Sequence, residues 1–428
     1  MAGQMGNVHR GNIVPAGGVT PNQVAGVVGG GMILPDTLQM QELAHIFMEN
    51  SEQNFLQMSK VPLVSGQTSN FNLQTVGLGE GLELLVDGWI DVRNTNATIA
   101  ENVTLHPDFP YNILRNITLI FNGQATLVQA SAYDLLMMMI KRNVRSGFAR
   151  SVNHAARVDR RICDVLVTGG TLVDGHGLSG HNMLTIPPLT TARVNVKFYI
   201  DLSFVLRKDL LLGLLPMANT SIHANVELMV APFVGTTPDF PFHASANLSL
   251  VGSSLNALPV YKFWALPKRR ELYEHFVNTS YIVTRHANKT IPSVGERVIS
   301  FEVPINFWLV SALMTIRDSG RALVDVMGAI NNPHLVYNGT ITVDRSDIAV
   351  KTARDFLFYG LEIPTGMLIY DYANTGDLNG NSANMAKWLN MYQASNPVLL
   401  ADVLPAMAVP GSYDVTLERL APNHVQVI

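Results

Sequence analysis

Val194-Asn-Val-Lys-Phe-Tyr-Ile-Asp-Leu-Ser-Phe204 is the stretch of this chain that decides its fold class. An apolar side chain stands at every second position from Val194 to Phe204. A period of two is typical of a β-strand with one buried face. After the turn residues Asn219-Thr220, the same alternation runs from Ile222 to Val230. The stretch therefore predicts two successive strands, each with one face in a core.

A cluster of leucines separates these two predicted strands, in the sequence Asp209-Leu-Leu-Leu-Gly-Leu-Leu-Pro216. Leucine favours a helix, but Gly213 and Pro216 both break one. We therefore expect one or two turns of helix between the strands.

The period of two recurs on both sides of this stretch. On the N-terminal side, Leu85 and Trp89 are apolar exceptions on an otherwise polar face, which indicates packing of that face against something else. On the C-terminal side, Pro304 interrupts the polar face of a regular alternation and indicates an edge strand or a bulge. Strands are expected at 82–92, 97–106, 113–122, 248–250, 259–266 and 299–309, near residues 341, 356 and 368, and at 413–417.

Three further short helices are expected among the strands. One begins near Asp36 and places Leu43, Ile46 and Phe47 on a single stripe. A second opens with the capping box Ser131-Ala-Tyr-Asp134. A third follows Ser382, with Trp388 in its apolar face. The chain is thus predicted to be mainly β.

The composition excludes several classes of protein. The 428 residues are 47% apolar and only 14% charged, with a formal net charge of -4, which argues against coating a nucleic acid or a membrane through bulk charge. Either neighbouring subunits cover much of the surface, or the exposed faces carry neutral polar groups. Cys163 is the only cysteine, so no disulfide can form within the chain, and folding in a reducing cytoplasm is expected.

The start of the chain lacks a basic segment followed by an apolar core, and no apolar run reaches about 18 residues. Neither export by that route nor a membrane span is therefore expected. Residues 1–31 are rich in glycine and have no periodicity, so we expect a flexible arm.

No catalytic motif stands out: H-E-x-x-H, G-x-S-x-G and a Walker loop are all missing from the sequence. We therefore expect no enzyme activity and no cofactor. A weak calcium candidate is formed by Asp377, Asn379 and Asn381, but its twelfth position is Trp388 where a bidentate Glu is needed.

A basic segment at 141–161 is a candidate for contact with a polyanion, although it lacks the interleaved aromatic residues of a nucleic-acid surface. A loop that forms salt bridges with its neighbours is the competing interpretation. The arginines are Arg142, Arg145, Arg150, Arg157, Arg160 and Arg161.

Three stretches carry a resemblance to a known family: Val76-Gly-Leu-Gly-Glu-Gly-Leu-Glu-Leu-Leu-Val-Asp-Gly88, Pro110-Tyr-Asn-Ile-Leu114 up to Asn122-Gly123, and the leucine cluster up to Thr220. Together they resemble the double jelly-roll major capsid proteins of tailless icosahedral bacteriophages, the lineage of tectiviruses and corticoviruses. The resemblance implies an all-β fold: two jelly-roll β-sandwiches in tandem, with short helices and a flexible N-terminal arm. The implied division is 1–62 for the arm and its helix, 63–266 for the first jelly roll and 267–428 for the second.

The same resemblance implies a structural role in the virion capsid. The subunit would form pseudo-hexagonal homotrimers that assemble into an icosahedral shell. Its partners would be other copies of itself, minor capsid or penton proteins, and an internal membrane or the genome beneath the shell. The stripe of Leu43, Ile46 and Phe47 would serve assembly, unless the helix only pads its own sandwich. The alternative function is a β-sandwich carbohydrate-binding or receptor-binding phage protein.

Overall fold

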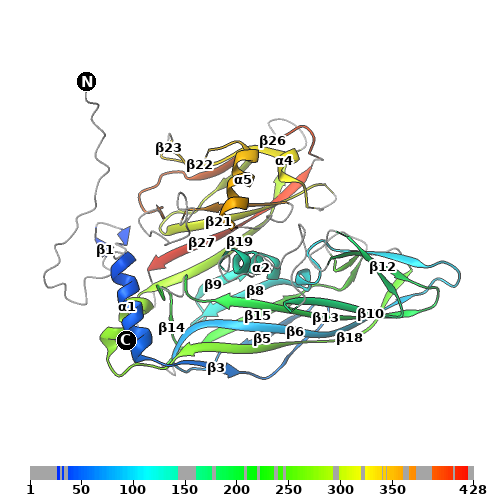
Figure 1. Cartoon of the computed structure of the whole chain (residues 1–428), viewed down its shortest axis with the longest axis horizontal. Coiled ribbons are helices and arrows are strands. Elements are labelled where there is room, and N and C mark those ends of the chain that lie inside the picture. The colour runs from blue at the N-terminus through cyan, green and yellow to red at the C-terminus, as the bar shows by residue number, and fades with distance from the viewer. Residues whose placement is uncertain are drawn as a thin grey trace.

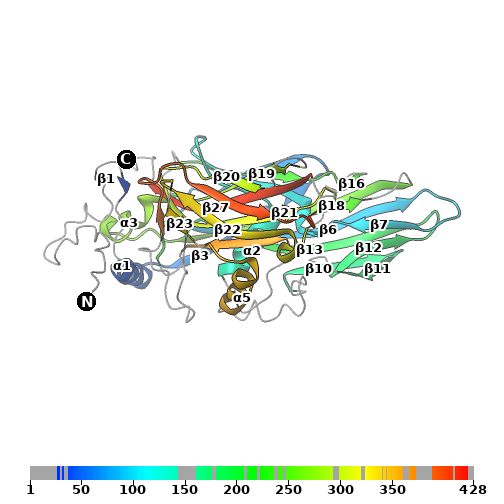
Figure 2. The same ribbon diagram turned by 90° about the horizontal axis from the view of Figure 1, so that it is seen from above.

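A computed structural model of the chain consists of two β-sandwiches, one above the other, with helix α2 (Ala132–Arg142) between them (Figure 1). Both sandwiches are elongated in the same direction (Figure 2). The mainly β prediction is thus confirmed. The structure describes residues 27–28, 31–32, 37–142, 161–175, 180–206, 210–218, 222–235, 240–243, 247–292, 298–319, 323–339, 341–343, 345–359, 366–372, 388–407 and 410–422.

The outer layer of the first sandwich is a seven-stranded sheet built around the stretch that opens the sequence analysis. Strand β13 pairs antiparallel with β6 along its whole length, and β6 pairs in turn with β18. The side chains of Phe198 and Ile200 are fully buried in the first core, as the alternation predicts. The strands in spatial order are β10 (Cys163–Thr168), β13 (Thr191–Ser203), β6 (Leu78–Asn94), β18 (Leu248–Trp264) and β3 (Gln53–Gln57), with β14 (Leu215–Pro216) on β6 and β4 (Val61–Leu63) on β18.

A nine-stranded sheet runs from the first sandwich into the second. The link is a short parallel pairing of Val283 and Thr284 in β19 with Val128 and Gln129 in β9. The two sandwiches therefore share one continuous sheet. Its order is β24 (Met367–Asp371), β21 (Trp308–Arg317), β27 (Gly411–Pro422), β19 (Thr279–Ile291), β9 (Ala125–Ala130), β8 (Leu114–Phe121), β15 (Ala224–Val230) and β5 (Thr68–Asn72), with β25 (Leu389–Asn390) on β21.

Two smaller sheets and a hairpin complete the described strands. The five-stranded sheet belongs to the first sandwich, and the four-stranded sheet covers the second. The first is β11 (Thr171–Asp174), β12 (His181–Ile186), β7 (Glu101–Leu105), β17 (Phe242–His243) and β16 (Val234–Gly235); the second is β20 (Val298–Glu302), β26 (Val398–Val403), β22 (Ile330–Tyr337) and β23 (Ile341–Val343); the hairpin is β1 (Val27–Val28) and β2 (Gly31–Met32).

Helices are few and short in the described part of the chain. Helix α1 stands beside one end of the sandwiches, and α5 lies over the second sandwich (Figure 1). No described helix is long and apolar enough to cross a membrane. Besides α2, the helices are α1 (Thr37–Asn50), α3 (Glu274–Val277), α4 (Val326–Ala329) and α5 (Ile348–Tyr359), with 3-10 turns η2 (Tyr111–Ile113) and η5 (Arg270–Leu272).

The helix predicted in the leucine cluster is wrong for residues 210–218, which form turns and the short strand β14. Leu211 and Gly213 both have positive φ angles, of 51° and 103°, which a right-handed helix does not allow. The leucines are nevertheless buried, because the irregular segment folds inward.

Three expectations for the second half are also corrected. The alternation at 299–309 is split: β20 and β21 lie in different sheets, and Asn306, with a φ of 69°, turns the chain after Pro304. Phe356 lies in helix α5. The helix expected after Ser382 lies partly outside the described residues; within them, Leu389 is in strand β25.

The predicted boundaries at residues 62 and 266, between the arm with its helix and the two jelly rolls, remain predictions. Strand β3 lies N-terminal to residue 62 and pairs with β18 of the first sandwich. The apolar core of the first sandwich also includes residues of the second half, such as Val283, Leu313 and Ile369. The interior of the second sandwich forms a separate cluster that includes Val415 and Leu417.

Candidate functional site between the two sandwiches

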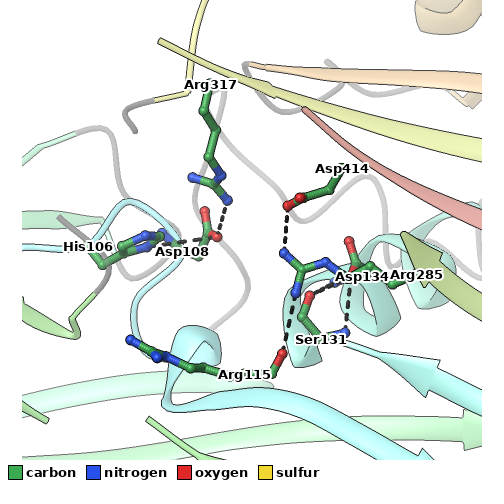
Figure 3. Close-up of polar contacts among 8 residues, drawn as sticks. All are labelled: His106, Asp108, Arg115, Ser131, Asp134, Arg285, Arg317 and Asp414. Atoms are coloured by element: carbon green, nitrogen blue, oxygen red, sulfur yellow. Dashed lines mark hydrogen bonds and ion pairs between the residues drawn. The ribbon is translucent and has the colours of Figure 1, made fainter. Parts of the chain in front are cut away.

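A cluster of charged side chains lies where the two sandwiches meet (Figure 3). From the first sandwich come His106, Asp108, Arg115, Ser131 and Asp134. From the second come Arg285 on β19, Arg317 on β21 and Asp414 on β27. We call these eight residues the polar junction.

Helix α2 places Asp134 in the polar junction through the predicted capping box. The Ser131 Oγ accepts a hydrogen bond from the Asp134 backbone N–H at 3.1 Å. In return, the Asp134 carboxylate accepts hydrogen bonds from the Ser131 N–H at 3.1 Å and from its hydroxyl at 2.6 Å. This exchange is the capping box that the sequence predicts, and it fixes the first turn of α2.

An ion pair between Arg317 and Asp108 forms one half of the polar junction. The Arg317 Nη2 donates to Asp108 Oδ2 at 2.6 Å; the Asp108 side chain is buried and that of Arg317 is 12% exposed. Burial opposes ionisation of Asp108, but the charge of Arg317, with a smaller contribution from His106, outweighs it and lowers the pKa of Asp108. The Asp108 backbone N–H donates to His106 Nδ1 at 3.0 Å, which places the imidazole beside the ion pair.

Arg285 forms the other half and contacts two carboxylates. Its Nη2 donates to Asp414 Oδ2 at 2.6 Å, and its Nε lies 3.4 Å from Asp134 Oδ2. Burial would lower the pKa of Arg285, but the two aspartates raise it above its usual value. Burial raises the pKa of Asp134, although Arg285 and Ser131 act in the opposite direction.

A second group of polar side chains lies at the C-terminal end of α2. The Lys141 Nζ is 2.6 Å from Glu418 Oε2 and 3.7 Å from Asp371 Oδ2. Glu418 also accepts hydrogen bonds from the hydroxyl groups of Tyr281 and Ser311. Helix α2 is therefore tied to the second sandwich by ion pairs at both of its ends.

The chemistry of the polar junction suits a joint between two domains. Arg285 and Arg317 each donate a hydrogen bond to a carboxylate at 2.6 Å. Such hydrogen-bonded charge pairs are directional. The junction also contains a partly open cavity of about 260 Å³ that residues of both sandwiches line. In the part of the chain that the structure describes, no three His, Cys, Asp or Glu side chains are grouped to hold a metal ion.

The predicted assembly stripe on α1 divides between core and surface. Phe47 is fully buried and packs edge-on against Trp264 and Phe276, with ring centroids 5.5 and 5.4 Å apart. Leu43 is half-buried against the same core, whereas Ile46 remains 37% exposed. The helix thus pads its own sandwich through two of the three residues, and the assembly role stays a prediction.

The other predicted site residues lie mostly outside the described part of the chain. Asp377, Asn379 and Asn381 of the calcium candidate are outside it, and so are Arg145, Arg150, Arg157 and Arg160. The backbone of Arg142 ends α2, and Arg161 is exposed in a turn. Both the calcium site and the polyanion contact stay predictions.

Burial, with a smaller contribution from Asp164, raises the pKa of the Cys163 thiol to about 12, so that it stays protonated.

The sequence did not indicate the polar junction. Asp414 stands on the polar face of an alternating strand, and such a face normally lies in solvent, whereas Arg317 ends a stretch that has no alternation. Only the capping box gave a signal, for Ser131 and Asp134. A pairing of distant charges cannot be read from one sequence.

Comparison by sequence finds no relative: no protein-family model matches the chain, and no curated protein matches it. Comparison by structure finds solved viral proteins. The major capsid protein of the virus STIV superposes with a TM-score of 0.56 at 10% identity, covering 88% of this chain and 100% of that chain. A structure of Sulfolobus turreted icosahedral virus gives a TM-score of 0.53 at 10% identity, covering 88% and 92%.

The major capsid protein of Faustovirus is also similar, with a TM-score of 0.51 at 8% identity, covering 87% of this chain and 90% of that chain. At such low identity these similarities establish the fold alone. The predicted double jelly-roll fold is confirmed, and it extends over almost the whole length of each protein compared.

Proposed function

We propose that this protein is the major capsid protein of a tailless icosahedral virus, with a bacterial host as the sequence resemblance implies. The observation that carries the proposal is the match of the whole double sandwich, rather than of one sandwich, to viral major capsid proteins. The role is structural, the protein resides in the virion, and it needs neither enzyme activity nor a cofactor.

We infer further that the subunit forms pseudo-hexagonal homotrimers which pack into the shell. The outer face of the first sandwich supports such a contact. Trp89 is only half-buried there, with the Arg193 guanidinium 4.1 Å above its ring, and Leu85 is half-buried on the same strand face. Leu166, two strands away, is 60% exposed. Partly exposed apolar side chains of this kind on the outer face of a sheet fit contact with a neighbouring copy of the subunit.

Static light scattering of the purified protein at micromolar concentration tests the trimer. A trimeric mass is expected, and a monomeric mass would contradict it. Trp89→Glu should weaken the trimer while leaving the subunit folded, because the Trp89 side chain lies outside the core. Ile305→Glu is a matched control, since Ile305 is 49% exposed on the second sandwich.

The N-terminal arm is proposed to contact neighbouring subunits, or the membrane or genome beneath the shell. Phe47 fastens α1 to the first sandwich through Trp264 and Phe276, so the arm before α1 starts from a fixed point. Deleting residues 1–34 should leave a folded trimer that assembles poorly. If the truncated protein builds normal shells, the arm has no assembly role; if it fails to fold, the arm belongs to the core.

A carbohydrate- or receptor-binding protein is the alternative that the sequence left open. Such a protein would bind immobilised glycans and would stay a small oligomer at any concentration. The capsid proposal predicts that the protein does not bind the glycans and that its trimers associate into large particles. Minor capsid or penton proteins remain proposed partners, to be sought by co-purification with assembled particles.

A further inference from the structure

We propose that the cavity in the polar junction is a hydration site, in which a cluster of ordered water molecules bridges the two sandwiches. This inference does not depend on the capsid role. It rests on the side chains that line the cavity, on its size and on its charge balance.

Three buried side chains of the first sandwich line the cavity with polar atoms that lack a hydrogen-bond partner among the described residues. Asp108, Asn112 and Tyr133 are 4%, 9% and 3% exposed. The atoms concerned are Asp108 Oδ1, both amide atoms of Asn112 and the Tyr133 hydroxyl. Buried polar groups in native proteins are almost always hydrogen-bonded, to protein or to water. Four such atoms around one cavity therefore indicate a shared partner inside it.

The opposite wall of the cavity is polar as well. The second sandwich contributes Thr315, Arg317, Ser412 and Asp414. A buried water molecule needs two to four polar partners, and this lining supplies them from both sides. The volume of about 260 Å³ leaves room for several waters, since one needs only about 10 to 15 Å³ of this measure. An apolar cavity of similar size would stay dry.

The charge balance favours water over an ion. The lining contains three aspartates, Asp108, Asp134 and Asp414, and three arginines, Arg115, Arg285 and Arg317. An anion would have to compete with Asp108 and Asp414 for the guanidinium groups that they already contact at 2.6 Å. A cation would meet the same competition from Arg285 and Arg317. A neutral molecule with both donors and acceptors has no such conflict.

Tyr133→Phe tests the proposal, because wet and dry cavities predict changes of opposite sign. If water accepts a hydrogen bond from the Tyr133 hydroxyl, removing that hydroxyl breaks the bond and should lower the melting temperature by about 1 °C. In a dry cavity, the variant would remove an uncompensated polar atom, and the melting temperature would stay unchanged or rise. Either of those results overturns the proposal.

Tyr111→Phe is the matched control. Tyr111 is fully buried, and its hydroxyl donates to the Tyr199 backbone oxygen at 3.1 Å, so this variant loses a hydrogen bond to the protein itself. It should lower the melting temperature, and the size of the decrease calibrates the loss in Tyr133→Phe.

A high-resolution crystal structure of the full chain gives an independent readout. Discrete water peaks within hydrogen-bonding distance of the Tyr133 hydroxyl and the Asn112 amide support the proposal. A cavity without density, or one filled by a single larger molecule, overturns it. Asn112→Leu, which fills part of the site with an apolar side chain, should remove the water peaks nearest to residue 112.

Discussion

The two faces of strand β27 differ in character although both are buried. Tyr413, Val415 and Leu417 face the interior of the second sandwich, in an apolar cluster. Asp414, Thr416 and Glu418 face the first sandwich and are 6%, 1% and 2% exposed. One strand thus separates an apolar core from a polar joint.

The difference shows how the two sandwiches are held together. Apolar contact is favourable but not directional, so it closes a core without fixing one orientation of two domains. Hydrogen-bonded ion pairs such as Arg285 with Asp414 are directional and tolerate little displacement. The charges placed here are also withdrawn from the surface, which makes the exterior of a chain with only 14% charged residues poorer still in charge.

The largest effect is expected for Glu418→Leu on the polar face. Glu418 accepts hydrogen bonds from Lys141, Tyr281 and Ser311, and its loss leaves a buried ammonium group without its nearest carboxylate. Breaking a buried ion pair in this way should lower the free energy of unfolding by about 3 to 5 kcal/mol. Equilibrium unfolding in urea measures this change.

The double variant Lys141→Met with Glu418→Leu is the control, since it removes both charges. It should recover part of the loss, because apolar pairs often replace buried ion pairs at little cost. If Glu418→Leu alone leaves the unfolding curve unchanged, the polar face of β27 does not hold the sandwiches together.

On the apolar face, Leu417→Ala should cost about 3 kcal/mol, through lost burial and the cavity left behind. Leu417 is fully buried in the second core. Leu166→Ala is the matched control at a site that is 60% exposed, with an expected change within about 0.5 kcal/mol. Equal losses for the two variants would contradict the assignment of Leu417 to the core.

Acid should weaken the polar joint through Asp108. Its pKa in the folded protein is lowered, so its ionised form contributes stability above the unfolded pKa of about 3.9, and this contribution is lost as pH falls through the folded pKa. Asp108→Asn should lower stability at pH 7 by about 2 kcal/mol and flatten its decline below about pH 4. Urea unfolding at a series of pH values measures both.

Asp134→Asn gives the contrasting pH profile. Because the pKa of Asp134 is raised, its contribution favours folding below the unfolded pKa and is lost as pH rises through the folded pKa. Asp134→Asn should therefore make the free energy of unfolding fall more steeply as the pH decreases. If both variants instead flatten the dependence of stability on pH, the pKa values of Asp108 and Asp134 are not shifted in opposite directions.

The smallest effect is expected for Ser131→Ala, which removes the capping box at the start of α2. The loss should be about 1 kcal/mol, because the hydroxyl bonds only to Asp134 within the cap. Thermal unfolding followed by circular dichroism measures it. A loss as large as that of Glu418→Leu would mean that α2 depends on its cap rather than on its ion pairs.

The sequence predicted what depends on local periodicity. Strands β13, β6, β8 and β15, the start of α1 and the capping box at Ser131 were all expected from spacing and turn residues, and the structure has them. The turn at Asn122 and Gly123 is there as well, with positive φ angles at both residues. The resemblance added the arrangement in two sandwiches.

The predictions that failed concern segments whose structure depends on contacts between residues distant in sequence. Leucine content favoured a helix at 210–216, but burial of these side chains in an irregular segment decided otherwise. Alternation across Pro304 was regular, yet the two halves belong to different sheets. The polar face of β27 follows the pattern of a solvent-exposed face and is buried only because the first sandwich covers it.

Negative-stain electron microscopy of the purified full-length protein, with mass photometry of the same sample, tests the capsid role most directly. The account predicts trimers that associate into closed shells of uniform size, and deletion of residues 1–34 should leave the trimers but reduce the shells. A full-length protein that remains monomeric, and forms no shells over a range of concentration and salt, would contradict the capsid role.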